Sequence, residues 1–408
     1  MAETYLYKVR DKQGKVLEGT LEADSTTLVA NKLRQMGYVP LAIDKKGGGS
    51  GLQKELKIPG MGAGKVKLKD LAVFNRQFAT MIDSGLSLLR SLNILAEQTE
   101  SKALAAVINE VRQDVEKGAS LSQAMARHPK VFNRLYIAMV RAGETGGVLD
   151  QTLLQLADTL EKAVELKHKI KSAMTYPVAV LALVLCIVTA MLVFIVPMFK
   201  DLYAELGGTL PLPTRVLLAV SSIMVTFMPF LILGMVGAVF AFKRWIETDK
   251  GRAAFDAFKL KVPVFGKLVH KTALVRFSRT LASLLRSGVP ILESLEITSD
   301  TVGNTVASNA VKDVQDGVKQ GEPIAKRMAE HAIFPPMVVQ MLAVGEETGA
   351  VDTMLDKIGE FYEQEVEATV AALTSLLEPA LIVVLGGAVG GMVVSLYMPM
   401  FNIIKLIQ

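Results

Sequence analysis

The sequence contains few of the residue types on which most catalytic and metal-binding sites depend. Its 408 residues include one cysteine and four histidines. The single cysteine, Cys186, excludes an intramolecular disulfide, and the scattered histidines lack the clustered spacing of a zinc site. Neither a Gly-x-Ser-x-Gly nor a His-Glu-x-x-His motif occurs. We therefore predict that the protein is not an enzyme and has no catalytic residue, metal or cofactor.

Three long segments lack charged side chains. Residues 172–199, 216–242 and 379–404 contain no Asp, Glu, Lys or Arg. Each segment exceeds the roughly 20 apolar residues that a helix needs to cross a hydrocarbon core about 30 Å thick. We therefore predict transmembrane helices over 173–199, 216–242 and 379–404. Because solute pathways usually place ionisable side chains inside the membrane, a small-solute transporter is only a distant alternative.

The flanking charges predict how the chain crosses the membrane. No apolar leader opens the sequence, so we expect a cytoplasmic N-terminus. Basic residues precede the first span and follow the second, whereas the loop at 200–215 balances two basic against two acidic residues. By the positive-inside rule this loop faces outward, which leaves 405–408 outside after the third span. The net charge of +5 is too small and too dispersed to indicate nucleic-acid binding.

The polar remainder separates into a small first domain and two larger helical ones. Alternating residues and turn signals near the N-terminus predict two strands, a helix and a third strand. A Gly- and Lys-rich linker follows, and it lacks the Gly and Ser/Thr positions that a phosphate-binding loop requires. Beyond it, apolar residues recur at helical spacing. We predict a small α+β domain over 1–46, a linker over 47–66, a first cytoplasmic helical bundle over 67–172 and a second over 270–378.

Much of the chain is duplicated. Residues match at an offset of 203 in the first part of each copy and at 202 after one deleted residue. This predicts two copies of a six-helix bundle followed by a span, both on one membrane face, with 216–242 as the unpaired return crossing. The matched pairs are Phe74 and Phe277, Gly85 and Gly288, Gly118 and Gly321, His128 and His331, Glu144 and Glu347, Asp150 and Asp352, Pro177 and Pro379, and Pro197 and Pro399.

Each copy contains a Glu-Thr-Gly segment that we predict to form a turn. Glu144 and Glu347 are candidates to accept hydrogen bonds at the N-terminus of the following helix. Gly146 and Gly349 complete the two segments. The alternative is that these segments contact a partner or share a cation between subunits.

The repeated spans carry small residues and prolines at defined positions. Two overlapping Gly-x-x-x-Gly pairs in the third span allow close helix approach, either to another subunit or to the chain's own spans. A proline stands at the entry of each repeated span, where it is tolerated, and a second one stands near the outer end, where it is expected to kink or end the helix. The glycines are Gly386, Gly387, Gly390 and Gly391, and the prolines are Pro177, Pro197, Pro379 and Pro399.

The first copy resembles the type II secretion F domain family in several motifs. They are Phe-x-Arg-Gln-Phe-Ala at Phe74, Ser-Gly-Leu at Ser84, Ala-Gly-Glu-x-x-Gly at Ala142 and Tyr-Pro at Tyr176. The second copy departs in detail, with Val344-Gly345-Glu346-Glu347 at the third motif and Glu378-Pro379 at the fourth. The resemblance covers nearly the whole chain, and the N-terminal domain resembles the extension found in the pilus branch.

This resemblance implies a mainly α integral membrane protein with two duplicated six-helix cytoplasmic bundles, three transmembrane helices and a small N-terminal α+β domain. It further implies an inner-membrane platform protein of the PilC and GspF types, serving a type IV pilus or, alternatively, a type II secretion system. The implied partners are a cytoplasmic hexameric assembly or retraction ATPase, the major pilin, other inner-membrane pilus assembly proteins, membrane lipid and further copies of the chain, as a dimer or trimer.

Overall fold

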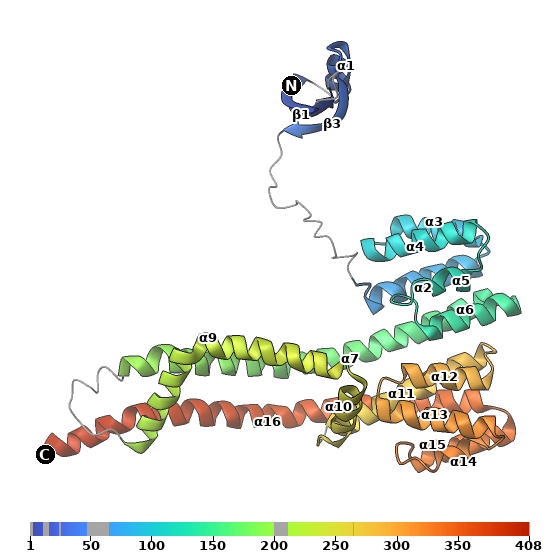
Figure 1. The fold of residues 1–408 in the computed structure, drawn as a ribbon. Helices are drawn as coiled ribbons and strands as arrows, with labels where there is room; N and C mark the ends of the chain where they lie inside the picture. The colour runs from blue at the N-terminus through green and yellow to red at the C-terminus, as the bar shows by residue number, and fades with distance from the viewer. Residues whose placement is uncertain are drawn as a thin grey trace. The chain divides into compact units, whose positions relative to one another are not determined.

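The computed structural model describes residues 3–10, 16–23, 26–46, 65–199, 211–263 and 265–407. The chain divides into two compact units, residues 1–63 and 64–408. It is mainly helical, as expected (Figure 1). The predicted linker at 47–66 lies outside the described residues except for its last two, and so does the predicted outer loop up to residue 210.

The N-terminal unit is a three-stranded antiparallel sheet with one helix. Strand β1 (Glu3–Arg10) lies between β2 (Val16–Ala23) and β3 (Val39–Lys46). Because side chains alternate along a strand, Tyr5 and Val9 of β1 face the same way. They pack against Val29 and Leu33 of α1, and all four are buried. Helix α1 spans Thr26–Gln35.

The first copy of the duplicated unit contains six helices over residues 65–199, and the last extends far beyond the others. Phe74 and Phe78 on α2 are buried, and the Phe74 ring lies 6.4 Å from that of Phe132. Gly85 and Gly118 end α2 and α4 at φ of 83° and 96°, a conformation that favours glycine. The helices are α2 (Leu68–Asp83), α3 (Leu88–Gln98), α4 (Lys102–Glu116), α5 (Leu121–Ala126), α6 (Arg134–Gly146) and α7 (Leu149–Ala190).

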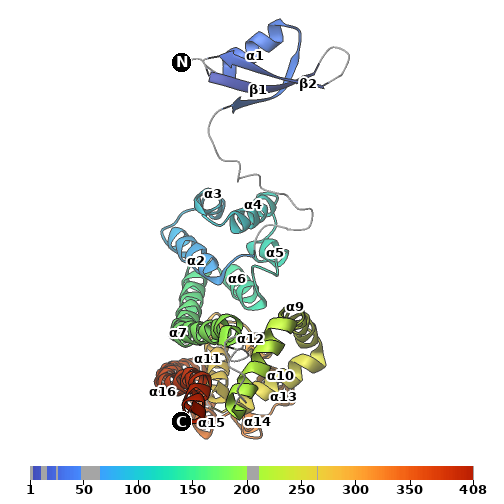
Figure 2. The same cartoon turned by 90° about the vertical axis from the view of Figure 1, so that its left-hand side faces the viewer.

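The second copy repeats this order around an equivalent core. Phe277 packs against Phe334 with ring centroids 5.2 Å apart, and Met328 is fully buried beside them. Its helices are α11 (Phe265–Arg286), α12 (Ile291–Thr301), α13 (Thr305–Lys319), α14 (Ile324–Met328), α15 (Pro336–Thr348) and α16 (Val351–Ile407), preceded by α10 (Asp249–Lys261). The short helices of the two copies lie on opposite sides of α7 (Figure 2).

The structure changes the register of the duplication. The offset is 203 between His128 and His331, but it is 202 between Phe132 and Phe334 and between Gly147 and Gly349. The deleted residue therefore lies between His128 and Phe132. Glu144 therefore corresponds to Glu346, and its pairing with Glu347 is wrong. The two members of each pair also have the same surroundings. The backbone N–H groups of His128 and His331 donate to the short helix before them, Phe132 and Phe334 are core residues, and Gly147 and Gly349 are left-handed helix ends.

Two helical segments are long and apolar enough to cross a membrane. Leu149–Phe199 and Val351–Met398 both run on from their bundles, and α7 and α16 lie side by side (Figure 1). The third predicted span falls on α9 (Leu212–Ile246), which is bent by 73° between its two arms. The two arms are long and apolar enough to cross a membrane only if they are counted as one span.

The predicted span prolines lie inside helices. Pro177 and Pro379 stand within α7 and α16, and α16 also continues through Pro399. Pro197 follows the π-helical turn η1 (Met191–Ile195). A proline lacks the N–H that would bond four residues back and its ring crowds that carbonyl, and a wider turn relieves both effects. Helix α7 continues past Pro177, and α16 continues past Pro379 and Pro399, instead of ending there.

Candidate functional site

A glutamate in each bundle caps a short helix through both carboxylate oxygens. Glu144 lies on α6 and Glu346 on α15. The N–H groups that they accept belong to the first turns of α5 and α14, where no intrahelical acceptor exists. Each carboxylate also meets the positive end of a helix dipole. The bonds run from Leu121 and Ser122 to Glu144, at 2.5 and 3.0 Å, and from Ile324 and Ala325 to Glu346, at 2.6 and 2.9 Å.

This arrangement departs from the predicted turns. The Glu-Thr-Gly segments form the ends of α6 and α15, and Glu144 caps an earlier helix rather than the following one. Gly146 is the last residue of α6, and Gly349 is the left-handed cap of α15. Glu347 is exposed. Among the described residues, no group of three His, Cys, Asp or Glu side chains is placed to hold a metal ion.

The glycine beside each capping glutamate lets two helices approach closely. A Cβ atom on Gly143 would lie 2.7 Å from Oγ1 of Thr152 on α7. A Cβ atom on Gly345 would lie 3.0 Å from the Cα of Val351 on α16. Both contacts are shorter than ordinary van der Waals distances, so only glycine fits without a shift. The capped helix and the long helix are thereby held against the same short segment in each copy.

An arginine of the first helix in each copy binds the long helix that follows. Arg76 donates to Glu161 at 2.7 and 2.6 Å and to Asp158 at 2.5 Å. Arg279 donates to Glu363 at 2.7 Å and to Asp356 at 3.2 Å. The hydrogen bonds from Arg76 lower the pKa of Glu161. Two-pronged arginine pairs of this kind fix orientation as well as distance, so α2 and α11 are tied to α7 and α16.

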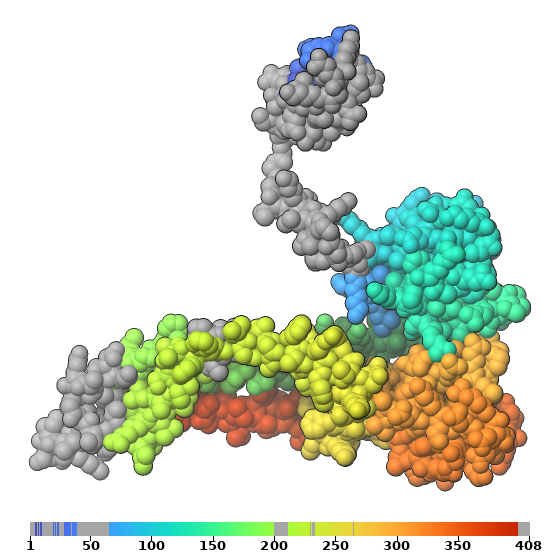
Figure 3. Space-filling view, in the orientation of Figure 1, coloured from blue at the N-terminus to red at the C-terminus, as the bar shows by residue number. Residues whose placement is uncertain are grey.

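The two bundles contact each other through apolar and polar groups, and buried Leu284, Val289 and Ile297 of the second copy belong to the hydrophobic core of the first. Arg134 on α6 reaches Glu296 at 2.7 Å and Asp300 at 2.5 Å on α12. Closer to the charge-free segment of α7, Lys169 reaches Glu367 of α16 at 2.6 Å. These side chains are roughly half exposed, and exposed pairs contribute about 0–1 kcal/mol each. The bundles meet directly in Figure 3.

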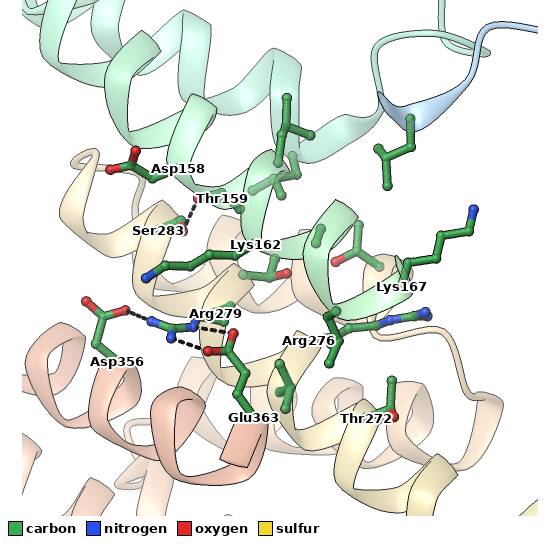
Figure 4. A pocket seen from close by; sticks show the side chains of 18 of the residues that line it. Asp158, Thr159, Lys162, Lys167, Thr272, Arg276, Arg279, Ser283, Asp356 and Glu363 are labelled. Atoms are coloured by element: carbon green, nitrogen blue, oxygen red, sulfur yellow. Dashed lines mark hydrogen bonds and ion pairs between the residues drawn. The ribbon is translucent and has the colours of Figure 1, made fainter. Parts of the chain in front are cut away.

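A cavity of about 790 Å³ opens between α7 of the first copy and α11 and α16 of the second. Figure 4 shows Arg279 between Asp356 and Glu363, and Thr159 bonded to Ser283 across the cavity. Arg276, one turn before Arg279 on α11, also lines it. None of these residues was a predicted site, since they come together only when the two copies pack.

The predicted membrane glycines face open space. Within the described chain, a Cβ atom on Gly386, Gly387, Gly390 or Gly391 would meet no atom within 4 Å. The chain's own spans pack elsewhere on α16, where Met392 and Leu396 contact Leu192 and Val196. Thr214 of α9 also donates to the carbonyl of Ser395 at 2.5 Å.

Comparison with known proteins adds to these observations. The family described as Type II secretion system (T2SS), protein F, matches residues 74–197 and again 277–399. The family described as Type II secretion system protein F, N-terminal domain, matches residues 1–44. The two matches to the first family coincide with the two copies of bundle and span.

Similar proteins cover the chain almost from end to end. Type IV pilus assembly protein PilC of Thermus thermophilus is 47% identical over 98% of this chain and 98% of its own length. The protein of the same name in Myxococcus xanthus is 40% identical over 99% and 96%. Type II secretion system protein F of Xanthomonas campestris is 35% identical over 99% of both.

Proposed function

Because the chain belongs to the type II secretion system protein F family, we propose that it is a non-enzymatic inner-membrane platform protein of a type IV pilus machine. The observation that carries this proposal is the identity of 47% and 40%, nearly end to end, to two type IV pilus assembly proteins. The secretion proteins are less similar, at 35% and 32%, so a type II secretion platform is the second candidate.

The proposed topology has three membrane crossings. The two long apolar helices supply the first and third, and the bent helix α9 supplies the return between them. The duplication supports this count, because two copies of bundle and span can share one face only if the chain crosses back. Both bundles are then cytoplasmic, the N-terminus is cytoplasmic and the C-terminus lies outside. The small N-terminal α+β unit is a separate cytoplasmic domain in this scheme.

The proposed mechanism passes movement from the cytoplasm to the membrane along α7 and α16. A cytoplasmic hexameric ATPase displaces the bundles, and the pilin is inserted into or withdrawn from the fibre at the spans. Each bundle is tied to its long helix by an arginine and by a glycine contact, and each helix runs on without a break. A continuous helix transmits displacement, whereas a flexible linker would absorb it.

The membrane glycines support self-association. Four glycines on α16 leave open space beside the helix, whereas the chain's own packing uses Met392 and Leu396. Small residues let helices of two copies approach closely in lipid. We propose that the copies of a dimer or trimer contact each other along this stripe of glycines.

The test begins by deleting the gene for this chain in the organism that carries it. Deletion is expected to abolish surface fibres while pilin still accumulates, and the full chain, purified from membranes in mild detergent, is expected to co-purify the cognate assembly ATPase. Secretion of exoproteins, measured in the same strain, separates the two branches. Normal fibres in the deletion strain, or loss of secretion with fibres intact, would overturn the pilus assignment. Absence of the ATPase from the purified complex would overturn the proposed coupling.

A further inference from the structure

The cavity between the copies carries four basic side chains that form no ion pair within the described chain, although Lys162 lies near enough to Glu165 and Glu360 to lower the pKa of both. Its acidic side chains are all engaged: Asp158 by Arg76, Asp356 by Arg279 and Arg286, Glu363 by Arg279 and Glu360 by Lys357. Two basic side chains of the cavity, Arg279 and Arg286, form ion pairs with these carboxylates. The lining residues that have no ion pair within the described chain are Lys162, Lys167, Lys171 and Arg276.

Three of these cations lie toward the membrane end of the cavity. Arg276 lies one turn before Arg279 on α11, and in Figure 4 it carries no bond to any residue drawn. Lys167 precedes the charge-free segment at Ser172 by five residues, or about 8 Å of helix. A phospholipid headgroup layer is about 5–7 Å thick on each side of the hydrocarbon. The cations therefore stand at headgroup depth if α7 enters the membrane at that point.

Apolar side chains continue from these cations toward the hydrocarbon. Ile170 and Met174 line the same cavity, and Met174 already belongs to the apolar segment of α7. Arg276 is exposed, but partial desolvation by the surrounding protein lowers its pKa. An unpaired guanidinium that is partly desolvated gains more from an anion than a fully hydrated one does. The cavity thus offers cations at one level and an apolar wall at the next.

We propose that this cavity binds an anionic phospholipid of the cytoplasmic leaflet, with its phosphate on Arg276 and Lys167 and an acyl chain along Ile170 and Met174. A soluble phosphate compound would use the cations but not the apolar wall. Bound lipid would fill the gap between α7 and α11 and stabilise the contact of the two copies near the membrane. The inference rests on the membrane placement of α7 proposed above.

The test titrates the full chain, purified in neutral detergent, with phosphatidylglycerol or phosphatidylcholine and counts retained lipids by native mass spectrometry. The wild-type chain is expected to bind phosphatidylglycerol at least about tenfold more tightly than phosphatidylcholine. The double variant Arg276→Gln with Lys167→Gln should bind phosphatidylglycerol about thirtyfold more weakly, since each basic residue contributes about fivefold to the affinity. Arg276→Lys with Lys167→Arg keeps the charges and should keep binding. Lys243→Gln with Arg252→Gln removes the same charge beside the membrane but outside the cavity, and should change binding less than about threefold.

Three results would overturn the lipid site. They are equal retention of the two lipids, an equal loss in the Lys243 and Arg252 control, and displacement of phosphatidylglycerol by millimolar inorganic phosphate or ATP. The last result would assign the cavity to a soluble anion. Alkaline carbonate extraction separates this failure from that of the proposed function: a chain that leaves the membrane disproves the spans, whereas a chain that stays but shows no lipid selectivity disproves only the site.

Discussion

At the scale of single residues, the two capping glutamates are the sharpest polar feature that the copies share. Each carboxylate satisfies two N–H groups of a short helix that would otherwise lack acceptors. The neighbouring residue in the second copy, Glu347, has the same chemistry but a different place, because it points to solvent. The pair Glu346 and Glu347 therefore provides its own internal control.

We predict that Glu346→Ala destabilises the protein and that Glu347→Ala does not. Loss of a cap costs about 1–2 kcal/mol, whereas an exposed substitution usually stays within about 0.5 kcal/mol. Thermal unfolding of the full chain in detergent, followed by circular dichroism, measures the difference as a midpoint lower by a few degrees for Glu346→Ala alone. Equal midpoints, or a larger loss for Glu347→Ala, would contradict a stabilising cap at Glu346.

At the scale of elements, the main feature is a helix that belongs to a bundle at one end and to the membrane at the other. Helix α7 runs from Leu149 through Pro177 to Ala190. Its segment between Leu160 and Ser172 is largely exposed, so its stiffness depends on helix propensity and local pairs more than on packing. That segment is where coupling is easiest to weaken without harming either end.

We predict that Glu165→Gly with His168→Gly reduces fibre assembly, whereas Glu165→Ala with His168→Ala does not. Both changes remove the same side chains, including the ion pair of Glu165 with Lys169. Glycine costs about 1 kcal/mol more than alanine at each helical position, so only the first change softens the helix. Surface fibres counted by electron microscopy give the comparison. Equal fibre numbers in the two strains would show that a stiff α7 is not needed.

The local parts of this architecture could be predicted from the sequence, and the contacts between its parts could not. Charge-free runs marked the two long apolar helices, and Gly85 and Gly118 stand at helix ends because a left-handed residue is a local requirement. The predicted position of the deleted residue lies too far along the chain. The sequence matched Glu144 to the identical residue Glu347, although Glu346 occupies the equivalent place in the structure. The cavity cations stayed hidden because α7 and α11 belong to different copies and meet only on folding.

At the scale of the whole molecule, the proposed function requires both bundles on the same side of the membrane. A platform that joins a cytoplasmic motor to a fibre outside needs its two soluble bundles on the motor's side. The duplication predicts this arrangement, and the contacts of Arg134 and Lys169 with the second copy require it within one chain. The bent helix α9 must then carry the chain back across the membrane.

Cysteine accessibility in intact spheroplasts tests this claim most directly. In a Cys186→Ser background, single cysteines replace Gln113 and Asp316, which are exposed equivalent positions of the two bundles, and Leu212, which is exposed at the start of α9. A membrane-impermeant maleimide is predicted to label Leu212→Cys in intact spheroplasts, and the two bundle positions only after lysis. Labelling of either Gln113→Cys or Asp316→Cys before lysis would place that bundle outside and contradict the account.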